Sequence, residues 1–144
     1  MRLSRIIKPQ VIIVAIFLAV VLLVPFETIV VPQWTIHAID QHGNSVSGVP
    51  ILESWRQYSF EPAGHEETLT TNDAGYVNFA VRKAKSNLLM RTLRTISNTI
   101  NPHGSTGPSA WILVRAPYKA ASEEPYFSPG KPLAETIVVQ RRQN

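Results

Sequence analysis

The longest uninterrupted run of hydrophobic residues lies near the N-terminus. Residues 11–26 read VIIVAIFLAVVLLVPF and carry no charge. As a helix at ~1.5 Å per residue, this run covers about 24 Å, slightly short of a ~30 Å hydrocarbon core. Residues 27–31 supply the remainder, and Pro9 suits a first helical turn. The pattern predicts a transmembrane anchor over residues 11–31, with residues 1–10 as a cytoplasmic tail.

Beyond this run, hydrophobic and polar residues alternate over short stretches, which is typical of half-buried β-strands. Turn-forming residues such as those of residues 40–45 and 72–75 separate the stretches. Residues 110–116 (AWILVRA) form the most apolar stretch and predict a central strand. We expect strands over residues 33–40, 46–58, 66–71, 76–82, 110–116 and 133–141. The side chains expected to face the core include Trp34, Ile36, Ala38, Val49, Ile51, Trp55, Val77, Phe79 and Val81.

The hydrophobic period changes to that of a helix over residues 85–100. Four apolar residues recur there at intervals of three and four and form one stripe: Leu89, Leu93, Ile96 and Ile100. Asn101-Pro102 ends the pattern. A surface helix usually packs such a stripe onto its domain, so we expect it to cover the sandwich. The opposite side carries Arg91 and Arg94, which could contact anionic lipid headgroups.

Short strands separated by turns predict an all-β fold. We expect an antiparallel β-sandwich of six to seven strands over residues 32–144. One helix over residues 85–100 is inserted in it, and the transmembrane helix precedes it.

Two stretches of the chain resemble a known family. "DQHGNSVSGVPI" (residues 40–51) and "TTNDAGYVNF" (residues 70–79) are similar to the two signatures of carboxypeptidase regulatory-like domains, the transthyretin-like or prealbumin-like β-sandwiches. A helix between the strands at Tyr76 and Ala110 also resembles transthyretin. The resemblance implies a sandwich that acts as an accessory, non-catalytic module of envelope proteins.

Departures from the family narrow what the resemblance implies. The transthyretin-like hydroxyisourate hydrolases end in Tyr-Arg-Gly-Ser, whereas this chain ends in QRRQN at residues 140–144, which argues against that activity. Collagen-adhesin relatives join a first-strand lysine to a last-strand Asn or Asp. Residues 33–40 contain no lysine, and the final strand has neither partner.

Charge and cysteine content exclude several classes of protein. The net charge is +4, but Arg2, Arg5 and Lys8 account for three of these charges, and from Pro32 onward 11 basic residues face 9 acidic ones. The globular part is therefore not a typical nucleic-acid binder. With no cysteine, the chain has no disulfide, thiolate metal site or thiol nucleophile.

The alternative to an anchor is a cleavable signal peptide, which has the same charged and apolar parts. No small-residue cleavage motif follows the apolar run, which favours retention of the segment. The basic residues ahead of it place the N-terminus in the cytoplasm and the C-terminal domain in the periplasm or outside the cell.

Candidate chemistry is sparse. His65, Glu66, Glu67 and His103 could contribute imidazole and carboxylate ligands to a metal, although the His-Glu-x-x-His pattern is missing. His103 also lies near Ser105 and Thr106, but the sequence has no Gly-x-Ser-x-Gly elbow and no obvious acid to orient the ring. We expect neither an enzyme nor a bound cofactor.

The loop over residues 117–132 is unusually long and contains four prolines. Its aromatic side chains Tyr118, Tyr126 and Phe127 could dock a protein partner, or could fold over the sheet.

The sequence thus predicts a single-pass membrane protein whose β-sandwich serves protein–protein interaction or envelope assembly. The alternative is a periplasmic domain that binds a metal or small ligand through His65, Glu66, Glu67 and His103.

Overall fold

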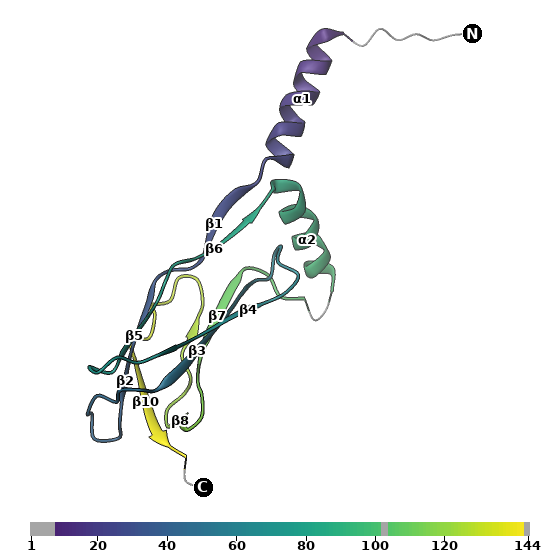
Figure 1. The fold of residues 1–144 in the computed structure, drawn as a ribbon. Helices are drawn as coiled ribbons and strands as arrows, with labels where there is room; N and C mark the ends of the chain where they lie inside the picture. The colour runs from purple at the N-terminus through teal and green to yellow at the C-terminus, as the bar shows by residue number, and fades with distance from the viewer. Residues whose placement is uncertain (1–7, 102–103, 143–144) are drawn as a thin grey trace.

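A long apolar helix projects from one end of a β-rich body. The computed structural model describes residues 8–101 and 104–142, which form two helices and ten strands. Helix α1 (Pro9–Leu23) leads into the body, and the chain leaves at the opposite end (Figure 1). Helix α2 (Leu88–Ile100) lies on the body close to the base of α1. The strands are β1 (Phe26–Val31), β2 (Trp34–Ile39), β3 (Pro50–Gln57), β4 (His65–Thr70), β5 (Tyr76–Phe79), β6 (Arg82–Ser86), β7 (Pro108–Val114), β8 (Tyr118–Ala120), β9 (Tyr126–Phe127) and β10 (Thr136–Arg141).

Two four-stranded sheets form the sandwich-like part of the fold. Their strand orders are β5-β2-β10-β8 and β4-β3-β7-β9, and a two-stranded ribbon of β1 and β6 joins the sandwich to the helices. The prediction of a β-rich sandwich with an apolar central strand at 110–116 is confirmed, because β7 lies between β3 and β9. The antiparallel prediction holds except for β2 and β10, which pair in parallel. The expected six to seven strands were too few, since the prediction missed β1, β6, β8 and β9.

Both sheets contribute to one hydrophobic core. The sheet containing β2 supplies Trp34, Ile36, Phe79 and Ile137, all at 0% exposure. The sheet containing β3 supplies alternate residues of β3 and β7, including Ile51 and Ile112.

The prediction that Val81 faces the core is wrong, because its side chain is 41% exposed. Inward residues of β5 have odd numbers, whereas Ala84 is the inward residue of β6. Ala80 and Val81 lie between these strands and belong to neither, so the side-chain alternation shifts by one residue.

The predicted anchor over residues 11–31 is wrong at its C-terminal end. Helix α1 ends at Leu23, and residues 26–31 form β1, which pairs with β6. Val30 and Val31 are buried in the sandwich core, which explains why this segment is not helical. Within the ranges 8–101 and 104–142, no helix combines the length and apolar character needed to cross a membrane.

Helix α2 matches the predicted helix, although it begins at Leu88 and not at residue 85. Residues 82–86 pair with β1, and the side chain of Asn87 then accepts a hydrogen bond from the Met90 amide at 2.8 Å, which caps the helix. The expected packing of its apolar stripe is wrong: the stripe is exposed, and the polar face lies against the body.

The two stretches that carry the family resemblance form tight turns. Asp40 Oδ1 accepts hydrogen bonds from the amides of His42 and Asn44, at 2.8 and 2.9 Å, and Asn72 Oδ1 plays the same role for Ala74 and Tyr76. These bonds explain why short polar side chains begin each turn.

Gly75 lies where the two turns pack closely against each other. Its φ is +80°, and a Cβ there would lie 3.0 Å from the Ala38 carbonyl oxygen and 3.0 Å from Ser45 Cβ. Gly75→Ala should therefore lower the free energy of unfolding by about 2 kcal/mol, measured by urea titration of the full chain in detergent. Gly43→Ala is the matched control, because Gly43 has a φ of +85° but open space around it. Equal losses for the two variants would contradict a steric contribution at Gly75.

Candidate functional site

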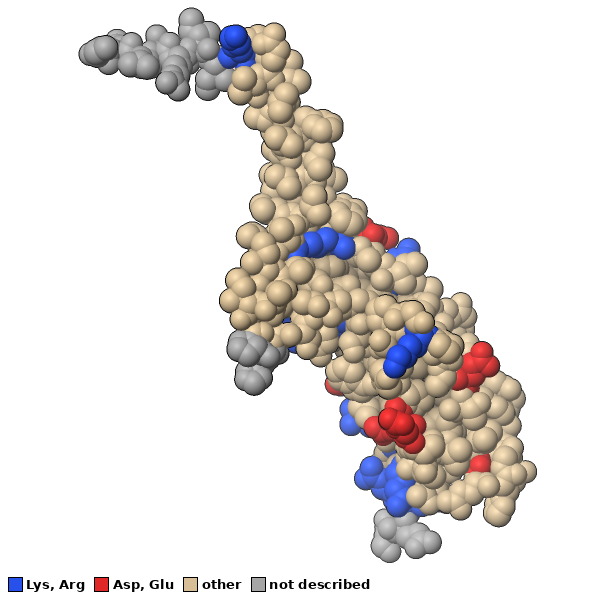
Figure 2. All heavy atoms as spheres, turned by 180° about the vertical axis from the view of Figure 1, so that it is seen from behind, with Lys and Arg blue, Asp and Glu red and all other residues tan. Residues whose placement is uncertain are grey.

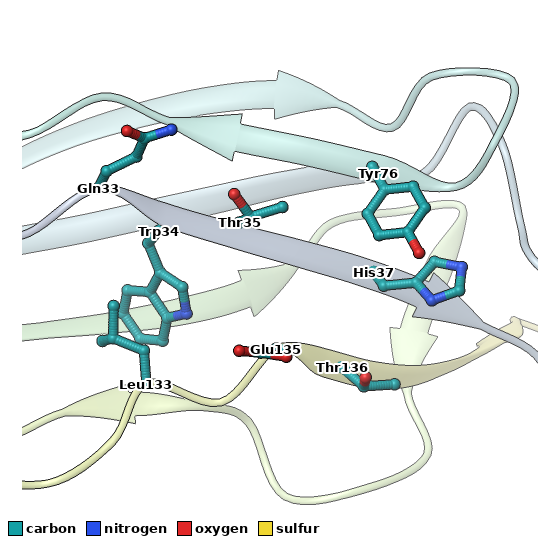
Figure 3. A pocket seen from close by; sticks show the side chains of 8 residues that line it. All are labelled: Gln33, Trp34, Thr35, His37, Tyr76, Leu133, Glu135 and Thr136. Carbon is teal, nitrogen blue, oxygen red and sulfur yellow. The ribbon is translucent and has the colours of Figure 1, made fainter.

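A shallow cleft of about 300 Å³ opens beside the parallel pair β2 and β10 (Figure 3). Strand β2 and the residue before it supply half of its lining residues, and β5 and the segment entering β10 close it on either side. The lining residues are Gln33, Trp34, Thr35, His37, Tyr76, Leu133, Glu135 and Thr136. The cleft thus combines aromatic surface with amide, hydroxyl, imidazole and carboxylate groups.

The His37–Tyr76 pair forms one end of the cleft. The two rings stack with centroids 4.1 Å apart and planes 9° from parallel, because the residues are direct neighbours across β2 and β5. His37 Nε2 lies 2.8 Å from Ser45 Oγ in the turn that follows β2. Figure 3 shows Glu135 nearer to Trp34 than to the imidazole, so it does not orient the ring as the acid of a catalytic triad would.

The other end of the cleft is built on Trp34. Its indole is buried and donates a hydrogen bond from Nε1 to the Ala134 carbonyl at 2.7 Å, which holds the segment before β10 against β2. Leu133 packs against the core beside it. A second hollow of about 450 Å³ adjoins the cleft at Thr136 and extends over residues 122–134.

These two hollows form a continuous polar and aromatic face, which we call the 122–136 face. It consists of those residues of 122–136 that line either hollow, together with the exposed side chains of Thr35 and Tyr76 and the half-buried His37. Sequence reasoning missed the His37–Tyr76 pair, because strand pairing brings these residues together across 39 positions of the chain. The available signal was their place on the polar side of two alternating stretches.

The three predicted partner-contact residues have different surroundings. Tyr126 is 54% exposed and accepts a hydrogen bond from Lys131 Nζ at 3.0 Å, within the 122–136 face. Tyr118 and Phe127 are half-buried and pack against the core. Of the three, Tyr126 is the exposed side chain, because adjacent residues of β9 point to opposite sides and Phe127 takes the core side.

Three of the predicted metal ligands lie in the part of the chain that the structure describes, and they do not form a cluster there. The fourth, His103, lies outside the described residues. His65 and Glu67 alternate with Glu66 along β4, so Glu66 points to the opposite side of the strand. His65 Nε2 lies 3.1 Å from Glu61 Oε1 and its ring stacks near Trp55, while Glu66 lies 3.9 Å from Arg115. Each of these groups already has a separate partner.

Glu67 belongs to a partly buried ion network centred on Arg82. The guanidinium group binds Glu53 Oε2 at 2.7 Å, also binds Glu67 Oε2, and lies 4.2 Å from the ring centroid of Trp55. Glu53 is 0% exposed and its Oε1 atom has no hydrogen-bond partner in the described structure. Burial raises the pKa of Glu53, because Arg82 shares its positive charge with Glu67 and compensates only in part.

The predicted membrane-contact residues Arg91 and Arg94 also differ from each other. Arg91 faces the protein: its guanidinium lies 4.0 and 4.2 Å from the ring centroids of Phe26 and Phe60 and donates to Thr28 Oγ1 at 2.6 Å. Arg94 is exposed on the same side of the helix, in a hollow with Tyr58. These protein contacts do not support the prediction that Arg91 contacts lipid headgroups.

No protein-family model, no curated protein and no solved structure matches this chain.

The buried carboxylate makes stability depend on pH in a specific way. A carboxyl group whose pKa is raised in the folded state stabilises the fold fully below its unfolded pKa, near 4.5, and loses this contribution as the pH rises through the folded pKa. We therefore compare the free energies of unfolding of the native chain and of Glu53→Gln by urea titration. The advantage of the native chain over the variant should decrease between pH 4 and pH 7.

Glu66→Gln is the control for this comparison, because Glu66 is an exposed carboxyl of the neighbouring strand. The difference in free energy of unfolding between the native chain and this variant should vary less with pH. If the stability advantage of the native chain over Glu53→Gln instead increased with pH, pairing of the Glu53 carboxylate with Arg82 would outweigh the cost of burying its charge.

Proposed function

We propose that the chain is a single-pass membrane protein that displays a non-catalytic β-sandwich outside the cytoplasm as a module for protein–protein contact. One observation carries this proposal: α1 projects from the body, and all of its residues are exposed although almost all are apolar. Exposed apolar surface of this extent is unfavourable in water and is typical of a helix surrounded by lipid.

The distribution of charge supports the same arrangement. In Figure 2 the projecting helix is uncharged along its length, and acidic and basic side chains gather over the body. Arg2, Arg5 and Lys8 precede α1, which favours a cytoplasmic N-terminus and a body in the periplasm or outside the cell. The sandwich would then be held close to the bilayer, because only Val24 and Pro25 separate α1 from β1.

The 122–136 face is the proposed protein contact. It lies on the sandwich and not on the helical end, and Tyr126 presents an exposed aromatic ring there. Aromatic side chains with a polar tip are enriched at protein interfaces. The polar groups with potential chemistry are occupied by internal contacts: His37 lies against Ser45 and Tyr76, and Glu67 binds Arg82. This supports a binding role over catalysis.

The family of the sandwich belongs to the same proposal. The turn motifs of residues 40–51 and 70–79 support a carboxypeptidase regulatory-like or transthyretin-like domain, as does a helix between β6 and β7. Such domains act as accessory modules, which agrees with a contact function in the cell envelope.

The anchor can be tested with a charge at the middle of α1. Leu18→Arg should shift the full chain from the carbonate-resistant membrane pellet to the supernatant, because a central arginine costs roughly 3 kcal/mol in a membrane helix. Leu18→Ala is the control and should stay in the pellet. A native chain that is itself extracted by carbonate would contradict the anchor.

The contact face can be tested by photo-crosslinking in intact cells. The full chain would carry p-benzoylphenylalanine in place of Tyr126 or Tyr76. The control position is the exposed Thr68 of β4, which forms the edge of its sheet opposite to β9. We expect an adduct of one defined mass at Tyr126 and Tyr76 and none at Thr68, read by immunoblot and mass spectrometry. Adducts at Thr68 alone would place the contact at the β4 edge and overturn the 122–136 face, and adducts at no position would contradict the proposed interaction.

A further inference from the structure

Helix α2 presents its apolar side to the outside of the protein. Its stripe, defined above as Leu89, Leu93, Ile96 and Ile100, is 37%, 54%, 52% and 76% exposed. At about 100° per residue, Arg91 and Asn98 lie on the opposite side of the helix. Within α2, Arg91 and Asn98 are the residues that are partly buried. A surface helix usually turns its apolar side toward the protein, whereas α2 turns its polar side toward it.

Specific contacts fix this orientation. Arg91 donates hydrogen bonds to Thr28 Oγ1 and to the carbonyl oxygens of Phe26 and Ser86, at 2.6, 3.0 and 3.2 Å. One turn from the end of the helix, Asn98 Nδ2 donates to the Tyr58 carbonyl at 2.6 Å. Turning the stripe inward would break all of these bonds, so the exposed stripe is a built feature of the fold.

The stripe continues the apolar surface of α1. Exposed large hydrophobic side chains of the described residues gather on two segments, residues 11–26 and α2, which contact each other at the base of α1. Phe26 lies between them, 46% exposed, with Arg91 stacked on its ring. Continuous apolar surface of this kind marks an interaction site, and here one end of it is the proposed membrane anchor.

The length of α1 leaves room for a second apolar element. At ~1.5 Å per residue its 15 residues span about 22 Å, some 8 Å less than a ~30 Å hydrocarbon core. An amphipathic helix at a membrane buries its apolar side ~5–10 Å deep at the boundary of headgroups and acyl chains. Helix α2 begins at the base of α1, so the N-terminal part of its stripe would supply the missing depth.

Charge around α2 suits an anionic bilayer surface. The sequence contains no acidic residue between Asp73 and Glu123, and Glu27, the cross-strand neighbour of Lys85, is paired with Lys83 at 3.5 Å. Lys85, just before the helix, and Arg94, on its polar side, are both exposed. Basic side chains that flank an apolar stripe bind anionic headgroups while the stripe enters the acyl region.

We infer that α2 is a second membrane-contacting element: its stripe lies among lipid acyl chains beside α1, and Lys85 and Arg94 lie at the headgroups. This inference rests on the proposed anchoring of the chain by α1. The element holds the sandwich at a fixed position against the bilayer, so the 122–136 face is presented to partners in one orientation.

The absence of native cysteine permits a direct test with single cysteines. Full-length variants Ile96→Cys, Thr95→Cys and Leu18→Cys would be labelled with the fluorophore NBD and reconstituted in vesicles of phosphatidylcholine and phosphatidylglycerol. Lipids with a nitroxide on the acyl chain then quench labels at that depth. Thr95 is the matched control, because it is exposed and adjacent but lies about 130° from the middle of the stripe.

With a nitroxide near the headgroup end of the acyl chain, we expect quenching at Ile96 to be several-fold stronger than at Thr95. Leu18, at the middle of α1, should be quenched most strongly by a nitroxide deep in the acyl chain. Strong quenching at Leu18 with equal, weak quenching at Ile96 and Thr95 would overturn this inference and leave the α1 anchor intact. A blue-shifted Ile96 emission without nitroxide quenching, increasing with protein density in the vesicles, would assign the stripe to a second copy of the chain instead. Absence of quenching at Leu18 would refute the anchor and, with it, the inference.

Discussion

The insertion of Arg91 between two aromatic rings determines how the helical end of this protein is built. Its guanidinium group stacks on Phe26 and Phe60 and hydrogen-bonds to β1 and to the end of β6. A guanidinium group has donors in its plane and weakly hydrated faces, so it can satisfy both kinds of contact in a partly buried position. This one side chain joins α2 to the ribbon below α1 and turns the apolar side of α2 outward.

Arg82 performs a related task inside the sandwich. It stacks on Trp55 and binds Glu53, a carboxylate at 0% exposure on the core side of β3. Removing Arg82 would leave the buried charge of Glu53 without compensation, which is far more costly than losing a surface pair such as Lys83 and Glu27. The basic residues of positions 82–94, close together in sequence, are therefore divided among different structural roles.

The fold separates its two kinds of surface. Exposed apolar side chains gather on α1 and α2, and the polar and aromatic hollows of the 122–136 face lie on the sandwich. The β1–β6 ribbon transmits the position of the helices to β2, because β1 leads into it with only Pro32 and Gln33 between. Such an arrangement suits a module that is fixed at its helical end and makes contacts through the side of the sandwich.

The sequence by itself determined the local features of this protein. Alternation located core residues of β2, β3 and β5, and an apolar run located β7. The helical period located α2, and turn residues located the bends at Asp40 and Asn72. Tertiary structure decided which way these elements face. Amphipathic periodicity gives α2 two sides but not their direction, which Arg91 sets through Phe26 and Phe60, far away in sequence. Likewise, only strand pairing brings His37 to Tyr76, and burial of Val30 and Val31 turns the end of an apolar run into a strand.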